Sequence, residues 1–147
     1  MKKVSAIVLA AALTTTSVFA HQGATGVVKE RMDAMSDIAA QLKSVNLMIR
    51  GTNDFDAAAV RAAMEKIADH AAMLPHQFPE GTDAAPSEAA PLIWTETEEF
   101  NAIFAQLELS AREIASLADD HSAVKAGFRA VAQTCKDCHE GYRIDRD

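Results

Sequence analysis

The stretch VKAGFRAVAQTCKDCHEGY, residues 124–142, decides the fold of this chain. Its apolar residues recur every three or four positions, which is the spacing of one face of an α-helix. That face carries Val124, Phe128, Val131, Cys135, Cys138 and Tyr142. We therefore predict an amphipathic helix over residues 122–142 that turns both cysteines of the chain toward a helical core.

Cys135, Cys138 and His139 form a C-x-x-C-H motif in this helix. Residues three and four apart share a helix face, so the two thiols can bond the vinyl groups of a haem and the imidazole can bind its iron. A C-x-x-C pair alone is also compatible with a redox dithiol, half of a zinc site or a disulfide. The sequence lacks the βαβ pattern of redox dithiols, and it has no second cysteine pair for a four-ligand zinc site. We predict one covalent haem c per chain, with a disulfide or dithiol as the alternative.

Residues 1–20 have the features of a secretory signal peptide. Two lysines precede an apolar run that is too short to span a bilayer, and small or modest residues end at Ala20. Removal of these 20 residues from the 147 leaves 127, enough for one domain over residues 21–147. Loss of Lys2 and Lys3 changes the net charge from −7 to −9. This acidity argues against nucleic acid and anionic membranes as partners, and the signal predicts a periplasmic location.

The rest of the mature chain also has helical periodicity. Apolar spacing predicts helices over residues 25–50, 56–74 and 93–118, with a Pro-rich loop over 75–91. Gly51 and Pro75 are expected to end the first two helices, Asp56 to cap the second, and Thr95 with Glu98 to form a capping box for the third. We therefore predict an all-α, antiparallel up-and-down four-helix bundle with a covalently bound haem c in its interior.

These features resemble the cytochrome c′ family, the class II c-type cytochromes, over essentially the whole mature chain. The haem motif near the C-terminus is followed by Tyr142-Arg143, which is similar to the ending of that family. Residues 28–31, followed by Met35, are similar to its first helix, and residues 91–94 to the entry of its third helix. The resemblance implies that His139 is the proximal iron ligand. It also implies that Arg31 approaches the haem propionates, that Arg143 lies beside the His139 ring, and that Met35 occupies the distal side.

The family resemblance leaves two functions open at the distal position. A methionine ligand gives a six-coordinate electron carrier, and Met35 is the candidate ligand. An open distal site gives a five-coordinate cytochrome c′ that binds nitric oxide or carbon monoxide, in which case Met35 is only packing. We predict the electron carrier, with an unidentified redox partner, and no enzymatic activity, because Met35 cannot serve as the acid–base group that a haem peroxidase needs. Relatives include homodimers and monomers, and the sequence does not choose between them.

Overall fold

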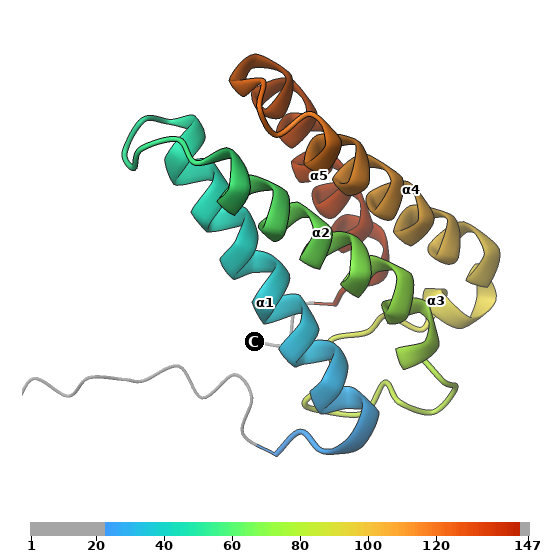
Figure 1. Cartoon of the computed structure of the whole chain (residues 1–147). Helices are drawn as coiled ribbons and strands as arrows, with labels where there is room; N and C mark the ends of the chain where they lie inside the picture. The colour runs from blue at the N-terminus through green and yellow to red at the C-terminus, as the bar shows by residue number, and fades with distance from the viewer. Residues whose placement is uncertain (1–22, 145–147) are drawn as a thin grey trace, which may run out of the picture.

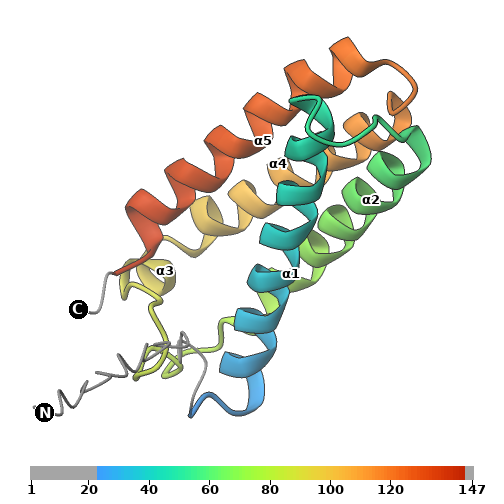
Figure 2. The same ribbon diagram turned by 90° about the vertical axis from the view of Figure 1, so that its left-hand side faces the viewer.

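The computed structural model describes residues 23–144 as a bundle of long helices joined by mostly short turns (Figure 1). The helices are α1 (Gly26–Ile49), α2 (Ala57–Met73), the 3₁₀ helix η1 (Leu74–Gln77), the short α3 (Leu92–Thr95), α4 (Thr97–Ser116) and α5 (His121–Tyr142). The four long helices alternate in direction, as Figures 1 and 2 show. The predicted all-α, up-and-down four-helix bundle is therefore confirmed. The predicted signal peptide, residues 1–20, lies outside the described residues.

The turn between α1 and α2 is built as the sequence predicts. Gly51 has a φ of 71°, the left-handed conformation that glycine adopts without strain. Its N–H donates to the carbonyl of Met48 at 3.1 Å, and the N–H of Thr52 donates to the carbonyl of Leu47 at 2.9 Å, which together make a Schellman motif. Asp56 then caps α2 by accepting hydrogen bonds from the backbone N–H groups of Ala58 and Ala59.

Two predicted boundaries differ from the structure. The chain does not leave helical geometry at Pro75, because η1 accommodates this proline near its start and continues to Gln77. The predicted helix over 93–118 is two helices, α3 and α4, separated at Glu96, whose φ of −121° and ψ of 45° are not helical. The predicted capping box is wrong, since the Thr95 hydroxyl donates to the carbonyl of Leu92 and α4 begins without a side-chain cap.

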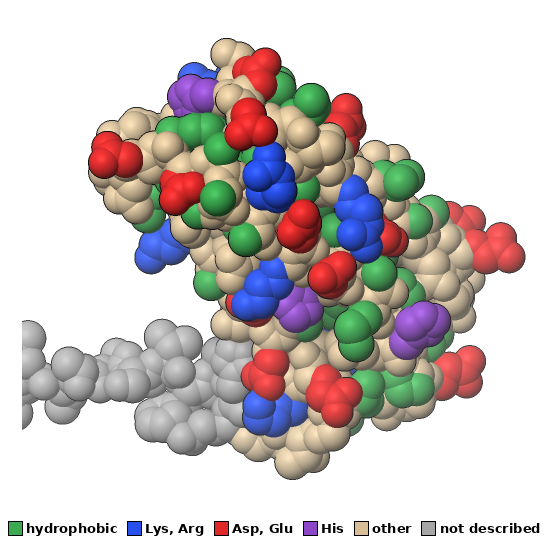
Figure 3. All heavy atoms as spheres, viewed as in Figure 1, with side chains coloured by type: hydrophobic (Ala, Val, Ile, Leu, Met, Phe, Trp, Pro, Cys, Tyr) green, Lys and Arg blue, Asp and Glu red, His purple; other side chains and the backbone are tan. Residues whose placement is uncertain are grey.

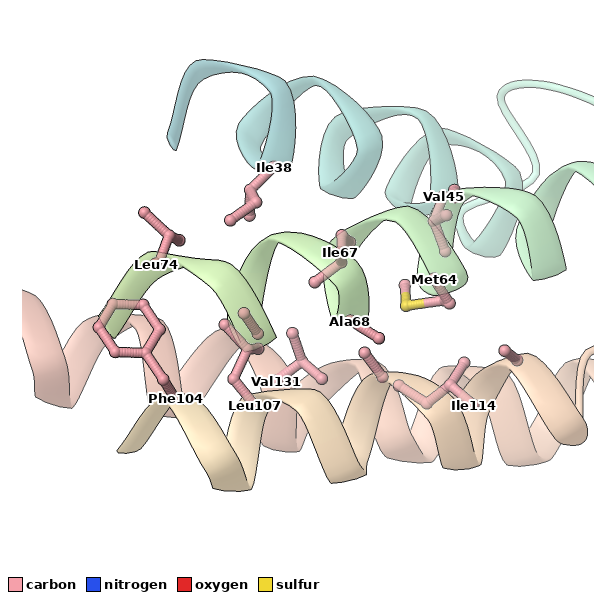
Figure 4. Packing of buried hydrophobic residues seen from close by; sticks show 14 of the residues in the cluster. Ile38, Val45, Met64, Ile67, Ala68, Leu74, Phe104, Leu107, Ile114 and Val131 are labelled. Carbon is pink, nitrogen blue, oxygen red and sulfur yellow. The ribbon is translucent and has the colours of Figure 1, made fainter. Parts of the chain in front are cut away.

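The core lies between all four long helices. Figure 4 shows side chains of α1, α2, α4 and α5 converging on it, and Val45, Met64, Ile67, Leu74 and Val131 are completely buried. Among the pairs of long helices that are in contact, α2 and α4 pack most extensively and α1 and α5 least. Figure 2 shows α1 and α5 diverging toward the end of the bundle that holds α3. The helix that carries the cysteines thus lies farther from α1 at that end of the bundle than at the other.

Charged side chains of both signs are interspersed on the face shown in Figure 3. Two ion pairs join helices across the surface, Lys66 with Asp37 at 2.8 Å and Arg112 with Asp69 at 3.4 Å. Such exposed pairs contribute little to stability, typically ~0–1 kcal/mol. None of the helices in residues 23–144 is long and apolar enough to cross a membrane.

Candidate functional site

The C-terminal half of α5 carries the three motif residues. Asp120 starts α5 by accepting hydrogen bonds from the N–H groups of Ser122 and Ala123, and the helix then continues without interruption to Tyr142. Cys135 and Cys138 are half-buried and pack against the core, as the predicted helix face requires. Burial raises the pKa of Cys138 to about 11 and also raises that of Cys135. The thiols therefore lack the lowered pKa that marks a reactive redox dithiol.

Two cavities flank this part of α5. The larger, of about 150 Å³, extends toward the end of the bundle at Arg31 and Arg143. The smaller, of about 110 Å³, extends along α1 and α4 and has an almost wholly apolar lining that includes Leu42 and Leu107. Four residues line both cavities: Met35, Phe104, Cys138 and His139. The cavities therefore meet at the motif histidine, with a methionine of α1 on their shared wall.

His139 is exposed at the mouth of these cavities. Desolvation lowers the pKa of His139, and the positive charge of Arg143 lowers it further, although the carboxylate of Glu88 acts in the opposite direction. The neutral imidazole is the form that binds a metal ion. The electrostatic environment of His139 is therefore suited to a metal ligand.

The α1 side of the larger cavity is formed by Arg31, Met32 and Met35. Arg31 and Met35 are four residues apart on the helix and thus lie on one face. Met35 lines both cavities, whereas Met32 lines only the larger one. Of the two methionines, Met35 is therefore the one placed where the cavities join at His139.

The C-terminal residues fasten the loop between η1 and α3 to α5. The N–H of Ala90 donates to the carbonyl of Tyr142 at 3.0 Å, and the N–H of Ile144 donates to the carbonyl of Glu88 at 2.9 Å. The guanidinium of Arg143 also pairs with the Glu88 carboxylate. This places Glu88 and Ala89 in the wall of the larger cavity, close to His139.

The structure brings together all six residues singled out in the sequence. Cys138, His139, Met35, Arg31 and Arg143 line the larger cavity, and Cys135 lines the smaller one. Three other residues of the larger cavity, Phe78, Glu88 and Ala89, come from the Pro-rich loop and were not predicted. That loop has no periodicity from which an inward direction could be predicted, and an aromatic residue among prolines was the only signal.

Comparison with known proteins identifies the family. The sequence model of cytochrome c′ matches residues 26–143. The chain belongs to the cytochrome c′ family. Cytochrome c-556 of Agrobacterium fabrum is 32% identical over 147 residues, which cover 99% of this chain and 97% of that protein. The structure of cytochrome c′ from Rhodopseudomonas palustris superposes with a TM-score of 0.78 at 28% identity, covering 84% of this chain and all of the other. A nitric oxide complex of a cytochrome c′ variant from Alcaligenes xylosoxidans gives a TM-score of 0.73 at 26% identity, over 81% of this chain and 94% of that chain.

The cofactor of this cytochrome c′ family member is haem c, and the described site fits it. Cys135 and Cys138 supply the two thiols on one helix face, with His139 beside them for the iron. The smaller cavity offers an apolar surface to the porphyrin ring, and the larger one ends at two arginines that suit carboxylate groups. The haem supplies a one-electron redox couple at iron.

Proposed function

We propose that this monohaem c-type cytochrome carries single electrons in the periplasm, with His139 and Met35 as the two axial ligands of its iron. The position of Met35, on the wall shared by both cavities and opposite the motif helix, carries this proposal. Methionine and histidine together favour reduced iron and raise the potential, as electron carriers of the cytochrome c type require. His139 and Met35 would hold the iron from α5 and α1, so that the pocket walls need not rearrange during electron transfer.

Arginine side chains support the placement of the haem edge. Arg31 and Arg143 both line the larger cavity, where the propionates would lie against them. Arg143 also acts on His139 through its charge. The terminal nitrogens of Arg31 already donate within the protein, and Arg143 pairs with Glu88. We propose that the positive charges of these arginines partly neutralise the carboxylates of the cofactor, while the apolar cavity beside Leu42 and Leu107 excludes water from the ring.

An electron carrier is favoured over a haem enzyme by the residues near Met35. A haem peroxidase needs an acid–base group above the iron. The side chains that share the cavity wall with Met35 on α4, Phe100 and Phe104, are aromatic and buried. Neither ring can transfer protons, so this wall of the cavity favours electron transfer over acid–base chemistry.

Gas binding is the second candidate function. The apolar wall formed by Phe100 and Phe104 would suit nitric oxide or carbon monoxide if Met35 did not bind the iron. The cytochrome c′ variant from Alcaligenes xylosoxidans, which has a similar fold, is a nitric oxide complex. In this alternative Met35 would be a packing residue beside a five-coordinate iron.

Optical spectra of the ferric protein separate the two functions. The electron carrier should show low-spin iron with a sulfur-to-iron charge-transfer band, and Met35→Ala should abolish the band and give a high-spin spectrum. Met32→Ala is the matched control, because Met32 lines only the larger cavity, and it should keep the band. A high-spin ferric spectrum in the unmodified protein, unchanged by Met35→Ala, together with a ferrous spectrum that carbon monoxide alters, would instead establish the gas-binding function.

A further inference from the structure

Arg31 is the only buried charged residue among residues 23–144, with 4% of its surface exposed. Its guanidinium donates hydrogen bonds to acceptors in residues 77–87. This segment runs from the end of η1 to residues 88–90, which are hydrogen-bonded to the C-terminal residues. One terminal nitrogen donates to the carbonyl of Gln77 at 3.2 Å and to the hydroxyl of Thr82 at 2.8 Å. The other donates to the carbonyl of Thr82 and to the hydroxyl of Ser87. A single α1 side chain thus fixes three points of this segment.

Phe78 is the part of the segment that reaches the cavity. Its ring centroid lies 4.7 Å from the guanidinium carbon of Arg31, within the range of a cation–π contact. The same ring packs edge-to-face on Phe100, with centroids 4.9 Å apart. Phe78 therefore stands between Arg31 and the aromatic wall that faces Met35.

The rest of the segment is held by contacts that do not involve Arg31. The indole N–H of Trp94 donates to the carbonyl of Phe78 at 2.9 Å, and Ser87 accepts a hydrogen bond from the N–H of Ala89 at 3.1 Å. Beyond Ser87, Glu88 and Ala90 form backbone hydrogen bonds and an ion pair with residues at the end of α5 and just after it. Replacement of Arg31 should therefore loosen the segment where it passes over α1 without detaching it from α5.

We propose that Arg31 is a positioning residue that holds the Phe78 ring against Phe100 and so limits how fast a small ligand reaches the distal side of the iron. This inference rests on the proposed function, because it requires a haem held by His139. Lysine cannot replace Arg31, since one ammonium group lacks the planar fork that reaches Gln77, Thr82 and Ser87 together. The proposed effect of Arg31 on ligand access operates through the Phe78 ring and does not depend on a contact between Arg31 and the cofactor.

The test measures the bimolecular rate of carbon monoxide binding to the ferrous haem protein after flash photolysis. All variants carry Met35→Ala, so that the distal position is open whether or not Met35 binds the iron. Arg31→Lys should raise the rate about tenfold, the order expected when a charge-assisted hydrogen bond no longer opposes opening. Phe78→Ala should raise it to a similar extent. Arg61→Lys is the matched control and should leave the rate unchanged, because Arg61 is a surface residue that pairs with Asp119 at 2.9 Å.

A protein that carries both Arg31→Lys and Phe78→Ala shows whether Arg31 changes the carbon monoxide rate by positioning Phe78 or by another route. If Arg31 acts through Phe78, Arg31→Lys should change the rate less than about twofold once Phe78 is alanine. A full tenfold effect in the Phe78→Ala protein, or no effect in either background, would overturn the proposal. Should Arg31→Lys fail to fold, Thr82→Val removes one hydroxyl acceptor and gives the same comparison with a smaller rise.

A different measurement shows whether the proposed function itself is wrong. Intact mass and haem absorbance are measured before any rate, and a haem-free protein would overturn the proposed function together with this inference. Haem-loaded variants whose carbon monoxide rates do not follow the predicted pattern would overturn only the role of Arg31.

Discussion

The close approach of α4 and α5 at Gly127 makes a quantitative prediction. A β-carbon built at Gly127 would lie 2.7 Å from Cγ1 and 3.1 Å from Cδ1 of Ile114. Ile114 is 3% exposed and belongs to the core, so its side chain has little room to move away. Gly127→Ala should therefore force either a new Ile114 conformation or a displacement of α5, the helix that carries the haem motif.

The expected size of this effect follows from two opposing contributions. Overpacking of a core by one methyl group costs about 1–3 kcal/mol. The better helix propensity of alanine offsets about 1 kcal/mol of that cost. Gly127→Ala should thus lower the free energy of unfolding by up to ~2 kcal/mol, or the melting temperature by up to ~8 °C.

Gly141 provides the control on the same helix, because a β-carbon built there meets nothing within 4 Å. Gly141→Ala should leave stability unchanged or raise it by up to ~1 kcal/mol. Urea unfolding of the haem-containing protein, followed by circular dichroism, measures both variants. In an Ile114→Ala background Gly127→Ala should become neutral or stabilising, because the clashing carbons are gone. Equal stability of the Gly127→Ala and Gly141→Ala proteins would refute the inferred packing of α4 on α5.

Two further predictions concern the first two helices. Asp56→Ala should cost ~1 kcal/mol in urea unfolding, because Asp56 caps two N–H groups of α2, whereas Asp54→Ala should have little effect. Hydrogen bonds from Lys66, His70 and Gln41 lower the pKa of Asp37 well below its usual range. Its folded pKa lies below the unfolded value of about 4, so its stabilising contribution is present above pH ~4 and is lost as the pH falls below that value. Acid titration of stability should therefore be shallower below pH ~4 for Asp37→Asn, and an unchanged slope would show that this network does not hold Asp37.

The helices and the site residues could be predicted because local chemistry determines them. The apolar spacing of α5, the Asp56 cap and the left-handed Gly51 each depend on neighbouring residues, and the structure agrees with all three. Helical periodicity predicted that Cys135 and Cys138 face inward, and both line the cavities, together with His139 and Met35. Whether Met35 binds iron is a matter of coordination chemistry and stays a prediction.

The Pro-rich loop could not be predicted, because its structure depends on distant contacts. Arg31 donates to backbone carbonyls and hydroxyls that are 46–56 residues away in sequence, and no pattern identifies such acceptors. The break at Glu96 was missed for a similar reason, since residues 93–118 have continuous apolar spacing. The turn is instead accompanied by tertiary contacts, such as the hydrogen bond from the Tyr142 hydroxyl to Glu96 at 3.0 Å.

The intact mass of the protein most directly tests whether Cys135 and Cys138 bind a haem covalently. The protein is first expressed in, and exported by, a host that attaches haem c. A single haem bonded to Cys135 and Cys138 predicts a product heavier than the processed chain by one haem, with neither thiol open to alkylation. A product with the mass of the polypeptide alone, and two cysteines that are alkylated or joined to each other, would contradict the central claim that the space between α1 and α5 holds a covalent haem.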